Sequence, residues 1–259
     1  MKELYCGRRR HRALYRGGTL VWERQEEIDP RLAAWWRFNG TGAQEKVSDK
    51  TGNGNDLALC NFAHTPGSGW TADGLQLDGV DDYCECPHSG TMALQSFTAL
   101  LWITYKGSPK KQSLLSKSGL SEDYMLYYDA RNASSPRIGM TLSGTDANTA
   151  YDLQDGQRYL LGYTYDGSTG RIYVDGAEVT TLPRTTPLVN STRRVLVGAY
   201  ENMGASTMST CIYHEIRMYN EALTAEEIRA ICTGGARLAT QAGDTLVTRD
   251  GNTIQVEEE

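Results

Sequence analysis

The sequence predicts an all-β fold in which two antiparallel sheets pack face to face as a sandwich. Asp-Gly and Gly-Gly turns separate the candidate strands, because glycine accepts the positive φ that tight hairpin turns need. Only residues 224–232 have the pattern of a helix, with Thr224 and Glu227 spaced as a capping box. Runs rich in Val, Ile and Tyr recur along the chain, as at 163–165, 171–179, 195–198 and 212–219.

Composition limits the class of protein. A chain of 259 residues can bury one large core or two small ones. With 22% charged and 39% hydrophobic residues, it has the balance of an ordinary globular protein. The net charge of −6 argues against nucleic acid as the main partner. No stretch approaches the length of a membrane span, and no apolar run of a signal peptide follows Met1.

The sequence patterns at the two ends of the chain differ from those of the central region. Residues 14–23 predict a hairpin with Gly-Gly at its turn, and residues 246–256 predict a second hairpin with an Asp-Gly-Asn turn. We therefore divide the chain into an N-terminal hairpin extension (1–31), the sandwich (32–233) and a C-terminal hairpin tail (234–259). The terminal hairpins could pair with each other or attach to other structural proteins.

Seven short motifs follow one another in a fixed order across the central region. The last joins an alternating strand to a short acidic helical turn, Ile212 to Ile228. Together they resemble the laminin-G-like domains of the concanavalin A-like lectin and glucanase superfamily. That resemblance implies a two-sheet jelly roll, a fold that more often binds sugars or proteins than cuts them. The motifs lie at 36–40, 49–57, 75–87, 96–103, 114–117, 163–176 and 212–228.

Some relatives in this superfamily hydrolyse glycosides, which requires two carboxylates flanking the scissile bond. The nearest match to their strand motif is Glu27 with Asp29, which lacks a third carboxylate and precedes the first sandwich strand. Asp81 and Asp82 are adjacent, so we expect them to face opposite sides of a strand. The sequence therefore predicts that the chain is not an enzyme.

The resemblance also implies a possible calcium site at one edge of the sandwich. The loop 49–56 offers side-chain oxygens and two glycines, and calcium prefers such oxygen ligands. The family usually adds an Asp and a Glu from the last strand, but His214 stands at the Asp position here, and histidine is a poor calcium ligand. The alternative is that the loop is only a well-made turn. The predicted ligands are Asp49, Asn53, Asn55, Asp56 and Glu215.

Carbohydrate recognition needs an aromatic surface with a few hydrogen-bonding groups. Residues 123–132 resemble the family's central strand, and alternation turns either Tyr127 with Asp129 or Tyr124 with Tyr128 away from the core. We choose the first pair; the alternative is that these tyrosines only pack. Trp35, Trp36 and Trp102 are expected in the core. The predicted carbohydrate-binding residues are Tyr127, Asp129, Arg131, Tyr200 and Asn202.

Cysteine spacing leaves the compartment open. No two of the six cysteines form a C-x-x-C pair, so neither a zinc site nor a thioredoxin-like pair is indicated. Cys84 and Cys86 are two residues apart in one predicted strand, a poor disulfide geometry, and are expected to be small buried side chains. A single bridge from Cys60 or Cys211 stays open.

The sequence favours a non-catalytic recognition module for carbohydrate, located outside the cell, on a cell surface or on a virion. The alternative is a phage virion or cell-surface adhesion protein attached through its terminal hairpins. That alternative rests on residues 14–23, which resemble short segments of phage tail and virion proteins.

Overall fold

The computed structural model describes residues 28–117, 123–185, 187–188, 191–201 and 204–233, together with the backbone of short strands at the two ends. The chain divides into two compact units. One consists of residues 31–233, and the other combines residues 1–30 with 234–259. In the second unit, β1 (Tyr5–Cys6) pairs with β2 (Arg9–Arg10), β3 (Ala13–Arg16) with β4 (Thr19–Glu23), and β21 (Leu246–Val247) with β22 (Thr253–Ile254).

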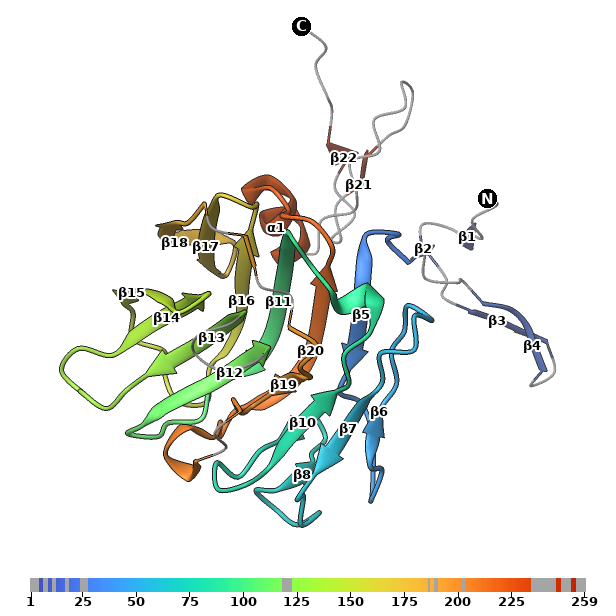
Figure 1. The fold of residues 1–259 in the computed structure, drawn as a ribbon. Helices are drawn as coiled ribbons and strands as arrows, with labels where there is room; N and C mark the ends of the chain where they lie inside the picture. Colours follow the sequence, from blue (N-terminus) through green and yellow to red (C-terminus); the bar gives the residue numbers. More distant parts are fainter. Residues whose placement is uncertain are drawn as a thin grey trace, which may run out of the picture. The chain divides into compact units, whose positions relative to one another are not determined.

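The unit 31–233 is a sandwich of two antiparallel sheets of eight strands each, as predicted (Figure 1). We call them sheet I and sheet II. In spatial order, sheet I contains β15 (Thr145–Ala150), β14 (Arg137–Leu142), β13 (Tyr124–Asp129), β12 (Lys111–Lys117), β19 (Val195–Val197), β10 (Tyr83–Cys86), β7 (Leu57–Cys60) and β6 (Lys46–Val47).

Sheet II is built around two long strands that pair over their whole length. These are β11 (Phe97–Thr104) and β20 (Ile212–Tyr219). Strand β5 (Leu32–Arg37) pairs with the 215–219 half of β20, and β9 (Leu75–Gln76) pairs with its first two residues. The remaining strands are β18 (Ala177–Pro183), β17 (Thr169–Val174) and β16 (Arg158–Tyr165) beyond β11, and β8 (Gly69–Trp70) beyond β9.

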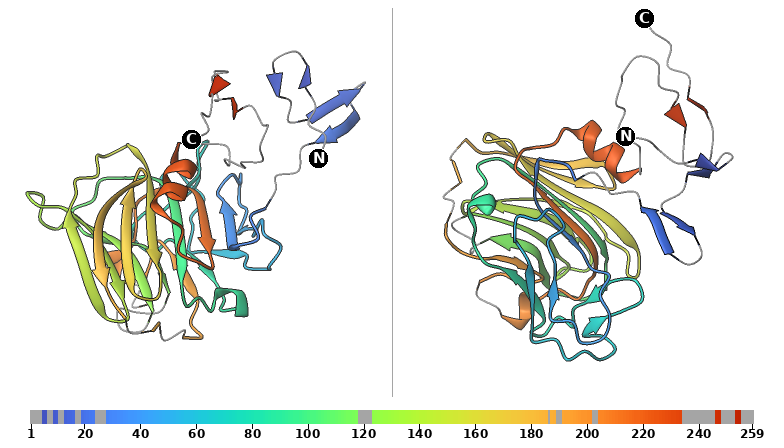
Figure 2. Two further views of the ribbon diagram at one scale, coloured as in Figure 1. Left: turned by 90° about the horizontal axis from the view of Figure 1, so that it is seen from above. Right: turned by 90° about the vertical axis from the view of Figure 1, so that its right-hand side faces the viewer.

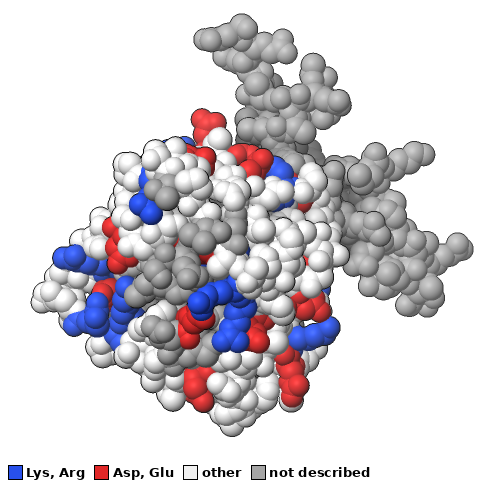
Figure 3. All heavy atoms as spheres, viewed as in Figure 1, with Lys and Arg blue, Asp and Glu red and all other residues white. Residues whose placement is uncertain are grey.

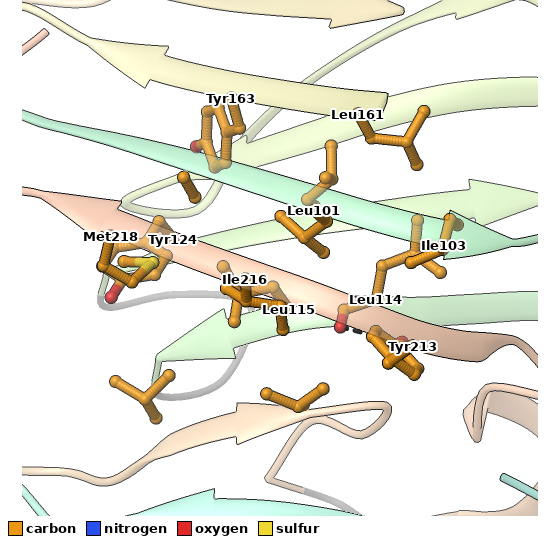
Figure 4. Close-up of a cluster of buried hydrophobic side chains, with 14 of the residues drawn as sticks. Leu101, Ile103, Leu114, Leu115, Tyr124, Leu161, Tyr163, Tyr213, Ile216 and Met218 are labelled. Carbon is orange, nitrogen blue, oxygen red and sulfur yellow. Dashed lines mark hydrogen bonds between the residues drawn. The ribbon is translucent and has the colours of Figure 1, made fainter. Parts of the chain in front are cut away.

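The main core lies between the two sheets. Figure 4 shows Leu101 and Ile216 of sheet II facing Leu114 and Leu115 of sheet I. The Tyr213 hydroxyl donates to the Leu114 carbonyl oxygen at 3.0 Å, which satisfies a polar group inside the core. Strand alternation turns Leu101 and Ile216 inward, whereas the adjacent Leu114 and Leu115 both reach the core because β12 has a bulge between Ser113 and Leu115.

A second, smaller core covers the outer face of sheet II. Helix α1 (Ala225–Cys232) packs Ile228 onto Leu100 and Leu160 of that face, and Figure 2 shows the helix beside these strands. Thr224 and Glu227 form the predicted capping box, so the sequence located the helix correctly. The short 3-10 helices are η1 (Gly90–Met92) and η2 (Ala205–Thr207).

The three tryptophans expected in the core divide between the two cores, and Trp102 is only partly buried. Trp36 is fully buried in the main core, and its Nε1 donates to the Asn55 carbonyl oxygen at 2.6 Å. Trp35 and Trp102 belong to the outer face of sheet II instead. Trp102 alternates with Leu101 and Ile103, which already fill the inner face, so the period of two turns it outward.

The cysteines whose side chains are described are free thiols. Cys84 and Cys86 are buried in the core, as expected for small apolar replacements. Burial raises the pKa of the Cys86 thiol to about 12, so it stays protonated and unreactive. Cys60, Cys211 and Cys232 are free as well.

Candidate functional site

A small pocket opens on the outer face of sheet I, next to the residues predicted to bind carbohydrate. Its volume is about 260 Å³. It lies where the start of β12, the loop after β13 and the segment around η2 meet. The pocket is lined by Lys111, Ser113, Met125, Arg131, Tyr200, Ser206 and Thr207.

Tyr127 supports one wall of this pocket. It faces away from the main core, whereas Tyr124 and Tyr128 point into that core. The Lys111 ammonium lies 3.7 Å from the centre of the Tyr127 ring, a cation–π contact. Burial lowers the pKa of Lys111, partly offset by Asp146 and Asp129. Tyr127 is only 3% exposed, so it holds Lys111 and does not present an open aromatic surface.

Asp129 fixes the side chain of Arg131 at the rim of the pocket. The Arg131 Nε donates to Asp129 Oδ1 at 2.9 Å, and Nη2 donates to Oδ2 at 2.6 Å, a two-pronged pair. These hydrogen bonds hold the pKa of Asp129 below its usual value. The guanidinium is thereby oriented while the Arg131 side chain keeps 66% of its surface exposed.

The opposite wall comes from the segment that leads into η2. Ser113 and Ser116 of β12 both donate to the Ala199 carbonyl oxygen, at 2.9 and 2.8 Å. These bonds fix the chain just before Tyr200, whose half-exposed side chain lines the pocket. Asn202, the last predicted carbohydrate-binding residue, lies outside the described residues.

The pocket therefore brings together two of the predicted residues, Arg131 and Tyr200. Lys111, Ser113 and Thr207 were not predicted from the sequence. Lys111 reaches the predicted site through its pairing with Asp129 across β12 and β13 and its contact with the Tyr127 ring, and that register is not visible in the sequence.

The loop predicted to bind calcium is held by hydrogen bonds to strand β5. Asp49 Oδ1 accepts from the Trp35 and Thr51 backbone N–H groups at 3.1 and 3.0 Å, and Oδ2 accepts from the Asn55 N–H at 3.2 Å. The Asn55 Nδ2 donates to the Ala33 carbonyl oxygen at 2.8 Å. Both carboxylate oxygens of Asp49 therefore already accept hydrogen bonds from backbone N–H groups of the turn and of β5.

The remaining predicted ligands have other partners. Asp56 accepts from the Asp49 N–H and pairs with Lys46 at 2.9 Å, and these two contacts hold its pKa below the usual value. Asn53 Nδ2 donates to the Ala33 carbonyl oxygen at 3.0 Å. The side chains of this loop are therefore arranged to stabilise a turn, because their oxygens already have partners. Calcium binding by this loop stays a prediction.

Glu215 belongs to a different cluster, on the outer face of sheet II. Its Oε1 accepts from the Trp35 Nε1 at 2.8 Å and from the Arg217 Nε at 2.6 Å. Arg37 lies 3.7 Å from Oε2 and also stacks over the Trp35 ring. The glutamate neutralises two arginines beside a tryptophan, which explains its position without a metal.

The prediction that Asp81 and Asp82 face opposite sides of a strand is wrong. Strand β10 begins only at Tyr83, and the two aspartates lie in the turn before it. Carboxylate oxygens of Asp78, Asp81 and Asp82 all lie within 4.8 Å of one another. A turn can bring adjacent side chains to one side, which the alternation of a strand cannot do.

Charge on the face seen in Figure 3 is mixed, with basic and acidic side chains interspersed. Such a surface has no extended basic field of the kind that nucleic-acid binding uses.

None of the helices in the described ranges combines the length and the apolar character that a membrane crossing requires.

Comparison with known proteins identifies the family. The family model described as the concanavalin A-like lectin/glucanases superfamily (Laminin_G_3) matches residues 78–229. The chain belongs to this family, and the resemblance predicted from its motifs is confirmed. No curated protein matches the chain. The comparisons give no support to the resemblance of the terminal segments to phage tail proteins.

Solved structures share the fold at low sequence identity. The sialidase of Trypanosoma rangeli in complex with sialic acid has a TM-score of 0.58 and 19% identity, over 79% of this chain and 33% of that one. The ligand-binding domain of botulinum neurotoxin serotype D in complex with N-acetylneuraminic acid has a TM-score of 0.58 and 11% identity, over 79% and 51%. The chain spans about a third of the length of the sialidases that it matches.

These comparisons correct one prediction. The sequence predicted that the chain is not an enzyme, and the similar structures include sialidases, so that exclusion is wrong. At identities below one fifth the likeness extends to the fold alone. The missing third carboxylate after Glu27 and Asp29 was too narrow a criterion, because the hydrolases' strand motif is only one way to place two carboxylates.

Proposed function

We propose that the chain is a carbohydrate-binding module whose site is the pocket on the outer face of sheet I. The observation that carries the proposal is the convergence of oriented hydrogen-bonding groups in one cavity of about 260 Å³. Arg131 is fixed by Asp129, and Lys111 is fixed over Tyr127. An extracellular, cell-surface or virion location is part of the proposal.

The chemistry of the pocket suits a sugar. Its lining combines cationic donors, hydroxyl groups and the edge of Tyr200, and a sugar ring offers both hydroxyl groups and an apolar face. The donors are held in place before binding, which reduces the entropy lost on association. Two structures of the same fold contain sialic acid or N-acetylneuraminic acid, which supports the choice of a glycan as the ligand class.

A glycan-array screen of the full-length protein tests the proposal, followed by calorimetry with the best glycan. Arg131→Ala and Tyr200→Ala are expected to weaken binding about 10-fold or more, because each removes a directed contact worth roughly 1.5–3 kcal/mol or a packing surface. Arg171→Ala is the matched control, since Arg171 also pairs with an aspartate, Asp166, at 2.6 Å. Arg171 lies in β17 of sheet II and does not line the pocket.

Two outcomes would contradict the proposal. The first is an array with no selective binding, either with calcium or with a chelator. The second is a bound glycan whose affinity is the same for wild type and both pocket variants, which would place the site elsewhere on the domain.

A second candidate function follows from the organisation of the ends. Residues 1–30 and 234–259 form one compact unit, in which β3 pairs with β4 and β21 pairs with β22. We propose that this terminal unit attaches the sandwich to other structural proteins. Concentration-dependent assembly in sedimentation velocity, lost when residues 1–30 are deleted, is the expected result. A full-length chain that stays monomeric at all concentrations would count against self-assembly through this unit.

A further inference from the structure

The turn before β10 gathers three carboxylates around a very tight backbone loop. Asp78 Oδ1 accepts hydrogen bonds from the N–H groups of Val80, Asp81 and Asp82, at 2.7, 3.3 and 3.3 Å. Gly79 has a φ of +74°, and a Cβ there would meet Lys110 and Thr210. The sequence therefore forces the chain to curl so that Asp78, Asp81 and Asp82 lie on one side.

One of these carboxylates is buried without a complete set of partners. Asp82 is fully buried, and its Oδ2 accepts from the Asp78 N–H at 2.9 Å. Its Oδ1 is buried and has no hydrogen-bond partner. A buried carboxylate oxygen that lacks a donor or a cation costs free energy. Burial raises the pKa of Asp82 to about 6, hydrogen bonds from the Ser68 side chain and the Asp78 N–H partly offset that increase, and the charges of Asp78 and Asp81 add to it.

A lysine lies near the cluster without forming an ion pair with it, since burial lowers the pKa of Lys110 and the charge of Asp78 partly offsets this. Lys110 donates from its Nζ to the Gly79 carbonyl oxygen and, at 3.1 Å, to the Ala205 carbonyl oxygen. Within the described ranges, no lysine, arginine or histidine forms an ion pair with Asp78, Asp81 or Asp82. The three carboxylates thus lack a counter-charge in direct contact.

We propose that Asp78, Asp81 and Asp82 bind a divalent cation, and that the ion is calcium. Calcium takes oxygen ligands at 2.3–2.6 Å, so two ligands on opposite sides of the ion are about 4.6–5.2 Å apart. Carboxylate oxygens that all lie within 4.8 Å of one another are close enough to share one ion of this size. Magnesium keeps several waters and is usually held by only one or two carboxylates, so a group of three suits calcium better. The ion would provide the missing partner of Asp82.

This site differs from the one predicted in the loop 49–56. There each carboxylate already accepts N–H donors or pairs with lysine, whereas here one buried carboxylate oxygen has no partner. The proposal also does not depend on carbohydrate binding, because none of the three aspartates lines the pocket.

Calorimetric titration of calcium chloride into the full-length, chelator-treated protein tests the proposal. We expect one ion per chain with a Kd on the order of 10⁻⁴–10⁻³ M, the range of weak extracellular sites. Asp81→Asn should weaken binding at least about 10-fold, because it removes one charged ligand. Asp81 is exposed and none of its recorded hydrogen bonds involves its carboxylate, so this variant should melt like wild type in chelator. A rise in melting temperature with calcium provides a second readout.

Two control variants separate this site from the rest of the chain. Asp73→Asn removes the same charge from another exposed surface position and should bind calcium like wild type. Asp56→Asn alters the loop 49–56 and should also leave calcium binding unchanged. The proposal is overturned if wild type shows neither heat nor a melting shift in about 10 mM calcium, ten times the upper end of the expected Kd. It is also overturned if Asp81→Asn binds like wild type, or if Asp56→Asn alone abolishes binding.

Discussion

Gly139 occupies the position in β14 that lies directly across from Tyr127 in β13. The Tyr127 ring covers the glycine so closely that a Cβ added there would lie 2.7 Å from Cε2 and closer still to Cζ. Gly139→Ala therefore pushes the ring away from the strand. Since Lys111 contacts that ring and lines the pocket, the substitution also disturbs one pocket wall.

The expected magnitude is the balance of two opposing effects. Overpacking a tight site costs about 1–3 kcal/mol in the free energy of unfolding. Replacing a strand glycine by alanine recovers about 0.5–1 kcal/mol of backbone entropy. We expect Gly139→Ala to destabilise the protein by about 1 kcal/mol, with roughly 2 kcal/mol as the upper end.

A double-mutant cycle isolates the contact. In a Tyr127→Ala background the clash is gone, so adding Gly139→Ala should stabilise the protein by about 0.5–1 kcal/mol, and the sign of its effect reverses. Urea denaturation of the four proteins measures this. Gly90→Ala is the matched control, because nothing lies within 4 Å of a Cβ at Gly90. If Gly139→Ala has the same effect in both backgrounds, the ring does not lie over the glycine and the reasoning is refuted.

Three further predictions concern stability. Lys117→Met should cost about 3–5 kcal/mol in urea denaturation, because it leaves the Asp123 carboxylate, whose side chain is 1% exposed, without its cation; a loss below 1 kcal/mol would show that the pair is hydrated. Burial lowers the pKa of His214. Below about pH 6.5 this imidazole therefore binds a proton more readily in the unfolded chain than in the folded chain. Unfolding free energy should therefore fall as pH decreases from 7.5 to 5, and more steeply for wild type than for His214→Gln; parallel curves would contradict this. Thr224→Ala should cost about 1 kcal/mol by removing the cap of α1, measured as a lower melting temperature, whereas an unchanged melting temperature would mean that the cap contributes little.

Local chemistry explains why much of the fold could be predicted from the sequence. The turn between β17 and β18 needs positive φ at two successive residues, and Asp175 and Gly176 adopt φ of 48° and 80°. Alternation in β13 likewise predicted that Tyr124 and Tyr128 share one face while Tyr127 takes the other, although it left open which face meets the core. Both signals depend only on neighbours in the chain, so a single sequence contains them.

The candidate site could be predicted only in part, because its geometry depends on contacts between distant segments. Ser113 is brought to Ala199 by the pairing of β12 with β19 and by the bulge in β12. No local pattern encodes that pairing. The acidic turn was misinterpreted for the opposite reason, since Asp81 and Asp82 were assigned to a strand that begins one residue later.

The family motifs and the candidate site occupy different residues. The motif segments supply the core strands and the turns, as with Leu101 and Ile216 in the core and Thr224 at the cap of α1. None of the seven residues that line the pocket falls within one of the seven motif segments, although Met125 and Arg131 lie in the stretch 123–132 that resembles the family's central strand. The motifs therefore specify the fold more than the candidate pocket, and the same fold occurs both in sialidases and in a toxin's ligand-binding domain. It follows that the motifs identify the family, and that the proposed glycan class depends on the side chains of the candidate pocket.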